Sequence, residues 1–282
     1  MEPNEKPRRR MLVVLGVVVV VAVVAVIAAL VWPRGDDGQE DAAPSVQPGE
    51  DLEVVAGSGG GELAPDGQTP VGYEPTCQGA VQAATNYATL LSQADLDLPG
   101  GTEETVRSVL LDDSAADESM RVMKNEVIAN SLSSEEIEQM PDMYDSRFHP
   151  EWSGKYHVAE CVEGETATVG VSGVLTTQLP SDEANSEYTG RVFELVWADD
   201  DWKVQNEVTA EDDGASIIAP ALVETPEMTT GETTRVRWKD GEPETVTEDE
   251  DRVVLDSAAL ADAFGSASPG VDEWVSFQEG SE

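Results

Sequence analysis

The stretch Leu195-Val196-Trp197-Ala198-Asp199-Asp200-Asp201-Trp202-Lys203-Val204 carries the clearest fold signal in this chain of 282 residues. Three aspartates separate two runs in which apolar side chains recur at every second position. The apolar positions are Phe193, Leu195 and Trp197 before the aspartates, and Trp202, Val204 and Val208 after them. A period of two is typical of a half-buried strand, and a short polar run between two strands is typical of a hairpin turn. The stretch therefore predicts an antiparallel β-hairpin.

Two more strands are predicted before this hairpin. Tyr156 and Val158 lie on one face of a short alternating run. A longer alternating run extends from Thr166 to Thr176, and Gly164 lies at the turn between the two. With the hairpin, these strands predict a curved antiparallel meander that begins after Pro150.

The residues before Pro150 have a helical period instead. Apolar side chains recur at Ala80, Ala84, Tyr87, Ala88 and Leu91, which predicts an amphipathic helix over residues 77–92. Shorter helices are predicted from Thr102 and around Met120 and Met123. Ser133 followed by Glu136 resembles a capping box that starts a fourth helix. The sequence therefore indicates an α+β domain in which the helices precede the strands.

The C-terminal residues 214–282 have weaker patterns and are predicted to form a small β-rich extension. A hairpin is expected over residues 233–246, with Asp240-Gly241 as its turn. Residues 248–251 are four consecutive acids and are expected to form a solvated loop. A short helix over residues 256–264 and a terminal strand over residues 274–277 complete the extension.

The N-terminal region predicts a membrane anchor. Residues 11–32 contain no charge, and eleven of these 22 residues are valine. At about 1.5 Å of rise per residue, a helix of this length spans about 33 Å, enough to cross the hydrocarbon core of a bilayer. Four basic residues precede the span, in the tail formed by residues 1–10, and Arg34 alone follows it closely. The positive-inside rule therefore predicts a single-pass protein of the cell membrane with a cytoplasmic N-terminus and an extracytoplasmic C-terminal part.

A cleavable signal peptide is the alternative for this segment. The apolar region of such peptides has about 7 to 15 residues, which is shorter than the run found here. The longer run favours a retained anchor.

Residues 33–75 are expected to form a disordered acidic linker. They include nine glycines, six prolines and ten acidic residues, with Arg34 as the one basic residue. Such a composition buries too little apolar surface to offset the entropy lost on ordering. The expected organisation is thus a tail (1–10), a transmembrane helix (11–32), a linker (33–75), an α+β domain (76–213) and the C-terminal extension (214–282).

The charge of the chain excludes one class of partner. Asp and Glu number 57 against 16 Lys and Arg, for a formal net charge of −41 and an isoelectric point near 4.1. Nucleic-acid binding depends on cations that displace counterions from phosphates, so no nucleic-acid partner is expected. Three explanations for the acidity stay open: solubility beside an anionic cell wall, docking of basic partners, and adaptation to high salt.

The two cysteines, Cys77 and Cys161, are expected to form a disulfide. Both follow the predicted membrane span, and two cysteines in an oxidising compartment generally pair. A pair of buried free thiols is the alternative.

The sequence contains no recognisable set of catalytic, cofactor-binding or metal-binding residues. His149 and His157 do not have the spacing of common zinc ligands and are interpreted as a solvated loop histidine and a strand histidine. Residues 170–173, Gly-Val-Ser-Gly, lack the spacing of a nucleophile elbow. Neither a Walker A loop nor a Rossmann glycine pattern occurs. We therefore expect no enzyme activity, no cofactor and no metal.

The order of elements over residues 76–210, with its final Trp-acidic turn-Trp hairpin, resembles the NTF2-like (cystatin-like) cone, whose sheet wraps around the first helix. With the N-terminal anchor, the chain also resembles the VirB8/TcpC-type assembly components of bacterial conjugation and type IV secretion systems, and actinobacterial membrane proteins of unassigned role. These resemblances imply a non-enzymatic, membrane-tethered interaction or assembly protein that binds envelope proteins or further copies of itself. The alternative is a small-ligand-binding protein or enzyme that uses the interior of the cone, and its pocket would be lined by Tyr87, Phe193, Trp197 and Trp202 unless these aromatics are plain core.

Overall fold

The computed structural model describes residues 46–95, 98–124, 145–178, 185–208, 217–220, 228–239, 242–253, 255–265, 267 and 269–278. All of them belong to one compact unit, Ala43–Glu282. The predicted tail, the predicted transmembrane helix and the Ser133–Glu136 capping box lie outside these residues. Within the described part of the chain, no helix is long and apolar enough to cross a membrane.

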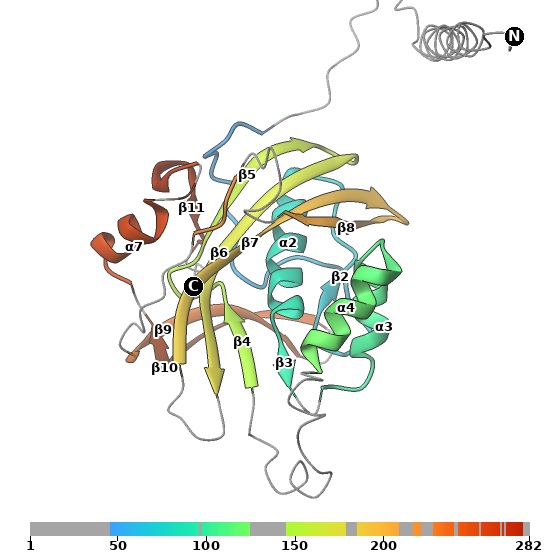
Figure 1. Cartoon of the computed structure of the whole chain (residues 1–282), viewed down its shortest axis with the longest axis horizontal. Helices are drawn as coiled ribbons and strands as arrows, with labels where there is room; N and C mark the ends of the chain where they lie inside the picture. The colour runs from blue at the N-terminus through green and yellow to red at the C-terminus, as the bar shows by residue number, and fades with distance from the viewer. Residues whose placement is uncertain are drawn as a thin grey trace, which may run out of the picture. The chain divides into compact units, whose positions relative to one another are not determined.

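The domain is α+β, with a curled antiparallel sheet that forms a half-barrel and four α-helices among the described residues (Figure 1). The helices are α2 (Cys77–Leu91), α3 (Thr102–Val109), α4 (Asp113–Met123) and α7 (Ser257–Phe264). The strands of the sheet are β3 (Ala94–Asp95), β4 (Asp145–His149), β5 (Lys155–Val162), β6 (Thr166–Gln178), β7 (Asn185–Ala198), β8 (Asp201–Val208) and β11 (Val275–Ser276). Two further pairs stand apart from it: β1 (Glu62–Leu63) with β2 (Pro70–Val71), and β9 (Met228–Lys239) with β10 (Glu242–Val253). A single 3₁₀ turn, Val271–Glu273, precedes β11.

Strand β6 is the centre of the sheet. One of its edges pairs first with β5 and then with β4, while the other edge pairs along most of its length with β7. Strand β8 then pairs with β7, and β11 extends the sheet beyond β5. Ala159 of β5 and Gln205 of β8 are each skipped in the pairing with the neighbouring strand, and such irregularities bend a strand and increase its twist.

The predicted hairpin is confirmed as β7–β8. Trp197 pairs with Trp202, and Asp199 and Asp200 between them have φ angles of 54° and 60°. A two-residue turn with both φ angles positive matches the twist of the two strands, and aspartate tolerates this conformation better than most residues.

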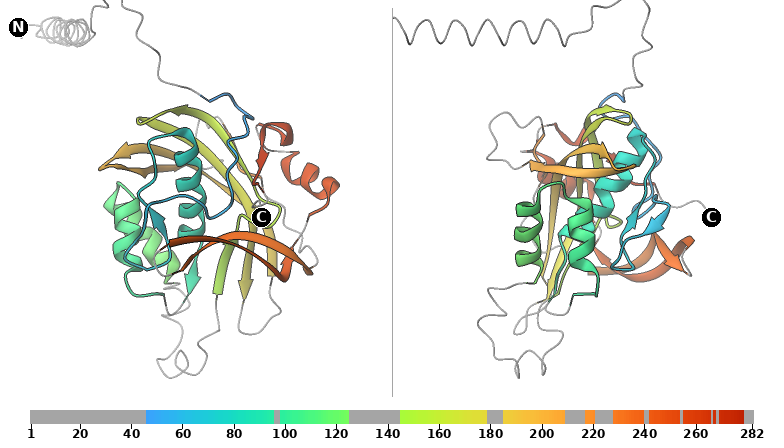
Figure 2. Two further views of the ribbon diagram at one scale, coloured as in Figure 1. Left: turned by 180° about the vertical axis from the view of Figure 1, so that it is seen from behind. Right: turned by 90° about the vertical axis from the view of Figure 1, so that its right-hand side faces the viewer.

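Helix α2 packs against β4, β5, β6, β7 and β8, so the half-barrel curls around it (Figures 1 and 2). The Thr76 hydroxyl caps its first turn by accepting a hydrogen bond from the Gly79 amide at 3.0 Å. Ala80, Ala83 and Ala84 are fully buried, and their small side chains let the helix approach the sheet closely.

Both faces of β6 are covered, which explains why residues 169–174 are buried without interruption. Val169 and Val171 face the core around α2, whereas Val174 belongs to a second core with Trp152, Tyr188, Phe264 and Trp274. The predicted C-terminal extension supplies α7 and Trp274 to this second core, and its strand β11 pairs with β5, so the extension packs on the sheet as part of the same unit.

Residues 46–75 correct the expectation of a disordered linker reaching Pro75. They are placed in the structure and pack on the domain, with Val54 and Tyr73 almost completely buried. The Leu52 amide donates to the Tyr156 hydroxyl at 2.8 Å, and the Gln278 amide donates to the Val54 carbonyl at 2.8 Å. These contacts join segments that are distant in the sequence, so the local composition did not indicate them.

Two smaller expectations are also corrected. The predicted C-terminal hairpin is longer than residues 233–246, because β9 and β10 pair from Met228 to Val253. The acidic residues 248–251 therefore lie in β10 and not in a loop. His149 ends β4 instead of lying in a solvated loop, and its side chain is 16% exposed.

Candidate functional site

The strongest candidate site is a cavity of about 380 Å³ between α2, β4 and β9. It lies on the side of the sheet where α2 packs, and the ribbon formed by β9 and β10 crosses there (Figure 2). Helix α2 contributes Asn86, Thr89 and Leu90, and Gln93 follows its C-terminal end. Strand β4 and the turn after it contribute residues 147–151, and β9 contributes residues 235–238. Residues 56–57 and 67–70 complete the wall.

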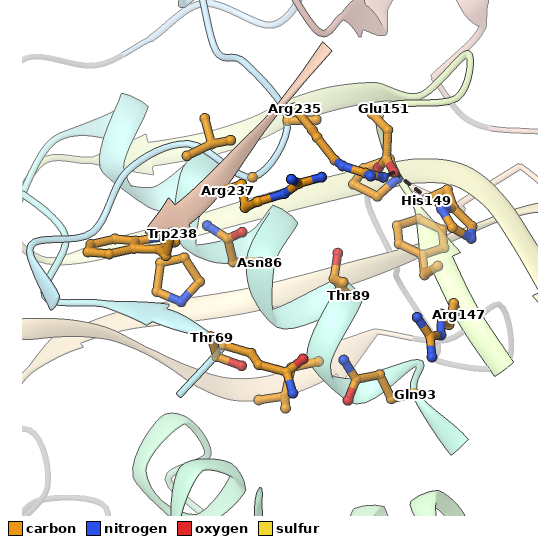
Figure 3. Close-up of a pocket in the computed structure, with 18 of the residues that line it drawn as sticks. Thr69, Asn86, Thr89, Gln93, Arg147, His149, Glu151, Arg235, Arg237 and Trp238 are labelled. Atoms are coloured by element: carbon orange, nitrogen blue, oxygen red, sulfur yellow. Dashed lines mark hydrogen bonds and ion pairs between the residues drawn. The ribbon is translucent and has the colours of Figure 1, made fainter. Parts of the chain in front are cut away.

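Two arginines of β9 share one carboxylate of the neighbouring strand. Glu248 on β10 lies 2.7 Å from Nη2 of Arg237 and 3.5 Å from Nη2 of Arg235. Arg235 and Arg237 are two positions apart, so the pleat of β9 places both on one face of the ribbon. Figure 3 shows their side chains along the upper side of the cavity.

The turn after β4 joins this ribbon to the half-barrel. Oε1 of Glu151 lies 3.9 Å from Nη1 of Arg235 and 3.2 Å from Nδ1 of His149. Nε2 of His149 lies 3.2 Å from the Thr176 hydroxyl, and the ring stacks on Trp152 with centroids 3.8 Å apart and planes 4° apart. These contacts hold the imidazole in one orientation at the cavity wall.

The α2 wall is polar and already hydrogen-bonded in part. Nδ2 of Asn86 donates to the Ser58 carbonyl at 3.1 Å and to the Tyr73 hydroxyl at 2.9 Å. Burial raises the pKa of Tyr73 well above its usual value, so this phenol keeps its proton. Its hydroxyl donates to the Pro70 carbonyl at 2.7 Å. The Asn86 side chain is thereby positioned by the segment that was expected to be linker.

The cavity lining is richer in arginine than the rest of the chain. Arg147, Arg235 and Arg237 line it, and Glu151 is the one carboxylate among its described lining residues. Each of these arginines is also ion-paired, with Asp145, Glu151 or Glu248. The guanidinium groups can still bind the oxygens of an anion through their remaining N–H donors.

The four aromatics predicted as pocket lining lie elsewhere. Tyr87 and Trp202 are fully buried in the core, where the Tyr87 hydroxyl donates to the Trp202 carbonyl at 2.9 Å. Trp197 is partly buried against Trp202, with ring centroids 5.5 Å apart. Phe193 is fully buried and borders a separate cavity of about 420 Å³ between α4 and β8.

The expected pairing of the two cysteines is present, with the sulfurs of Cys77 and Cys161 2.04 Å apart. The bond joins the first residue of α2 to β5, and both side chains are buried. It therefore clamps the central helix to the sheet.

The two histidines lie in separate environments. His157 is buried on β5, and its Nδ1 lies 2.8 Å from the Glu273 carbonyl. No group of three or more His, Cys, Asp or Glu side chains in the described ranges is arranged to hold a metal ion.

Sequence reasoning missed the residues that build the cavity between α2, β4 and β9. The sequence pattern places Arg235, Arg237 and Trp238 in a hairpin and gives them no role in a site, and no local pattern marks Arg147 or Glu151. One signal was present: few basic residues follow Arg34, and three of them lie together at residues 235–239.

The chain matches no protein-family model, no curated protein and no solved structure.

Proposed function

We propose that the protein is a non-enzymatic interaction or assembly protein of the cell envelope. Residues 11–32 tether it to the membrane, with the N-terminus in the cytoplasm and the half-barrel domain outside. The half-barrel is an NTF2-like cone, and the partners are envelope proteins of a conjugation or secretion apparatus or further copies of the chain.

The observation that carries the proposal is the packed interior of the half-barrel. Helix α2 fills its concave side, and Tyr87, Phe193 and Trp202 are fully buried there. Packing of this kind argues against the alternative of a ligand or an active site at the centre of the cone, and it leaves the outer surfaces for recognition. The cavity between α2, β4 and β9 is lined by none of these three aromatics and lies outside that packed centre.

The order of the elements supports the NTF2-like assignment. Helices α2, α3 and α4 precede the long strands, and the antiparallel sheet curls around α2. This is the arrangement that the resemblance implies. Because one fold serves many functions, the assignment by itself does not define a partner.

Two features support the tether and the outside location. The uncharged span of 22 residues follows a basic tail, which favours a cytoplasmic N-terminus. The Cys77–Cys161 disulfide suits an oxidising compartment, since such bonds are rare in the cytosol.

The location is tested by tagging the full-length chain after Glu282 or before Met1 and exposing intact cells to antibody. We expect the C-terminal tag to be detected on cells whose wall has been opened, and the N-terminal tag only after the membrane is permeabilised. The reverse result would contradict the orientation. Loss of all protein to the medium would contradict the tether.

The association is tested separately on full-length protein extracted in a mild detergent. Its mass in solution, corrected for bound detergent, is expected to exceed that of one 30.1 kDa chain. A monomer at every concentration, with nothing co-purifying, would overturn the proposal.

A further inference from the structure

We propose that the cavity between α2, β4 and β9 is a binding site for a small organic molecule that carries carboxylate or phosphate groups. This inference goes beyond the proposed association and does not depend on it.

The first support is the gathering of cations at one place in an acidic chain. Arg147, Arg235 and Arg237 are three of the seven arginines that follow Arg34, against 55 acidic residues over the same part of the chain. They come from β4 and β9, which belong to different sheets. The fold therefore places side chains of the rarer charge at a single cavity.

The second support is the type of cation. A guanidinium is planar and always charged, and its N–H groups match the paired oxygens of a carboxylate or phosphate. Figure 3 shows Arg235 and Arg237 on one side of the cavity, and Gln93 and Arg147 on the other. An anion between these walls would receive donors from both.

The ion pair of Arg147 is the one that a bound anion can most readily replace. The Arg147 side chain is 65% exposed beside Asp145. Exposed ion pairs contribute little to stability, because water and side-chain entropy offset the attraction. Arg147 can therefore turn toward a bound anion at small cost, while Glu248 holds Arg235 and Arg237 in place on the other wall.

The third support is the apolar part of the wall. The indole of Trp238 and the ring of Phe148 both line the cavity and can pack against the carbon skeleton of a ligand.

The size of the cavity favours a small molecule over a polymer. A volume of about 380 Å³ is within the range of about 300–1,000 Å³ that is usual for small-molecule sites. Because the surrounding chain is strongly acidic, long-range attraction does not assist a large polyanion, and binding must come from the local donors.

The test is calorimetric titration of the full-length protein in detergent with citrate and, separately, with inorganic phosphate. Sodium chloride keeps the ionic strength equal, and glycerol serves as the uncharged control. We expect saturable binding of citrate, phosphate or both, and none of glycerol. Binding of citrate alone identifies carboxylates as the ligand chemistry, and binding of phosphate alone identifies phosphates. No binding of either ion overturns the proposal.

Variants then locate the site. The pair Arg235→Gln and Arg237→Gln together should weaken binding at least about tenfold, since each lost charge-assisted contact is worth more than 1 kcal/mol. Arg147 lies on the opposite wall and is largely exposed, so Arg147→Gln should not disturb the β9–β10 ribbon. This variant should also weaken anion binding. Arg121→Gln removes one arginine of α4 away from the cavity and should leave binding unchanged. Equal affinity in all four proteins would overturn the assignment, while the association of the protein would be unaffected.

Discussion

Arg235 on β9 and Glu151 after β4 lie side by side in the wall of the candidate cavity, with Nη1 of the arginine 3.9 Å from Oε1 of the glutamate. The pair connects the β9–β10 ribbon to the half-barrel, and Glu151 also contacts His149. The Val236 amide adds a longer hydrogen bond, 3.4 Å, to the Ala56 carbonyl. The cavity therefore exists only when the ribbon is docked on the domain.

Asp201 holds the segment before α2 against the β7–β8 hairpin, so Asp201→Asn should destabilise the domain. Its buried carboxylate accepts hydrogen bonds from the Gly72 and Tyr73 amides, both at 3.0 Å, and from its neighbour Trp202. Asparagine keeps one acceptor oxygen and replaces the other by an NH₂ group, so at least one of these hydrogen bonds is lost, and we expect a loss of about 1–3 kcal/mol in the free energy of unfolding. Urea unfolding measures this loss.

Asp200→Asn is the matched control, since it removes the same charge one residue away. Asp200 is exposed in the turn at a φ of 60°, which asparagine also adopts. Its effect should stay within about 0.5 kcal/mol. Equal losses of unfolding free energy in the two variants would show that the hydrogen bonds of Asp201 add nothing to the stability of the domain.

The Cys77–Cys161 bond should contribute a large part of the stability. It closes a loop of 84 positions, for which the chain-entropy model gives about 4–5 kcal/mol. The double variant Cys77→Ala and Cys161→Ala should therefore unfold at a much lower urea concentration than the oxidised protein. Reductant should lower the midpoint of the wild type and leave the double variant unchanged. A wild-type midpoint that is insensitive to full reduction would contradict this expectation.

The buried tyrosines should make the domain sensitive to alkali. Burial raises the pKa of Tyr73, Tyr87 and Tyr188, and it raises that of Tyr156 to about 12. The neutral phenol is thus favoured in the folded state, while the unfolded chain titrates near 10. This contribution to stability is complete below pH 10 and is lost as the pH rises toward 12.

Ultraviolet absorbance of tyrosinate measures this effect. In the folded protein these four tyrosines should not ionise near pH 10, and their ionisation should coincide with the loss of the circular dichroism signal. In urea, all five tyrosines of the chain should titrate near pH 10. If these four tyrosines ionised near pH 10 while the protein stayed fully folded, their side chains could not be buried as the structure has them.

Gly154 should not tolerate a side chain. A Cβ at this position would lie 1.9 Å from the Pro150 carbonyl oxygen and 2.7 Å from that of Ser172. Gly154→Ala must therefore move backbone at the corner between β4 and β5, at a cost of about 1–3 kcal/mol. Gly100→Ala is the control, because nothing lies within 4 Å of its Cβ position. Thermal unfolding of the two variants should differ clearly, and coincident melting curves would argue against a crowded corner.

The elements that could be predicted from the sequence are those with local periodic patterns. The β7–β8 hairpin, the β5–β6 pair and α2 occur where the periods of two and 3.6 placed them. Each of these segments has its own apolar face, and the structure buries that face. The terminal strand predicted over residues 274–277 is likewise present as β11.

The elements that could not be predicted are held by contacts between distant segments. Residues 46–75 have the composition of a linker, yet Val54 is buried and Gly72 is bound by Asp201. Strand β4 is short, and its only fully buried apolar side chain, Phe148, gives no period. The cavity is the extreme case, because its arginines come from two strands whose proximity no local pattern indicates.

Whether the protein works by association outside the membrane is tested most directly by crosslinking in cells, followed by mass spectrometry. An amine-reactive crosslinker that does not cross membranes can reach only the four lysines after the anchor, Lys124, Lys155, Lys203 and Lys239, which lie on α4 or its end, β5, β8 and β9. We expect crosslinks from these lysines to further copies or to envelope proteins, and none when all four are changed to arginine. A wild-type chain that stays uncrosslinked, under conditions that join the subunits of other envelope complexes in the same cells, would contradict the proposed function.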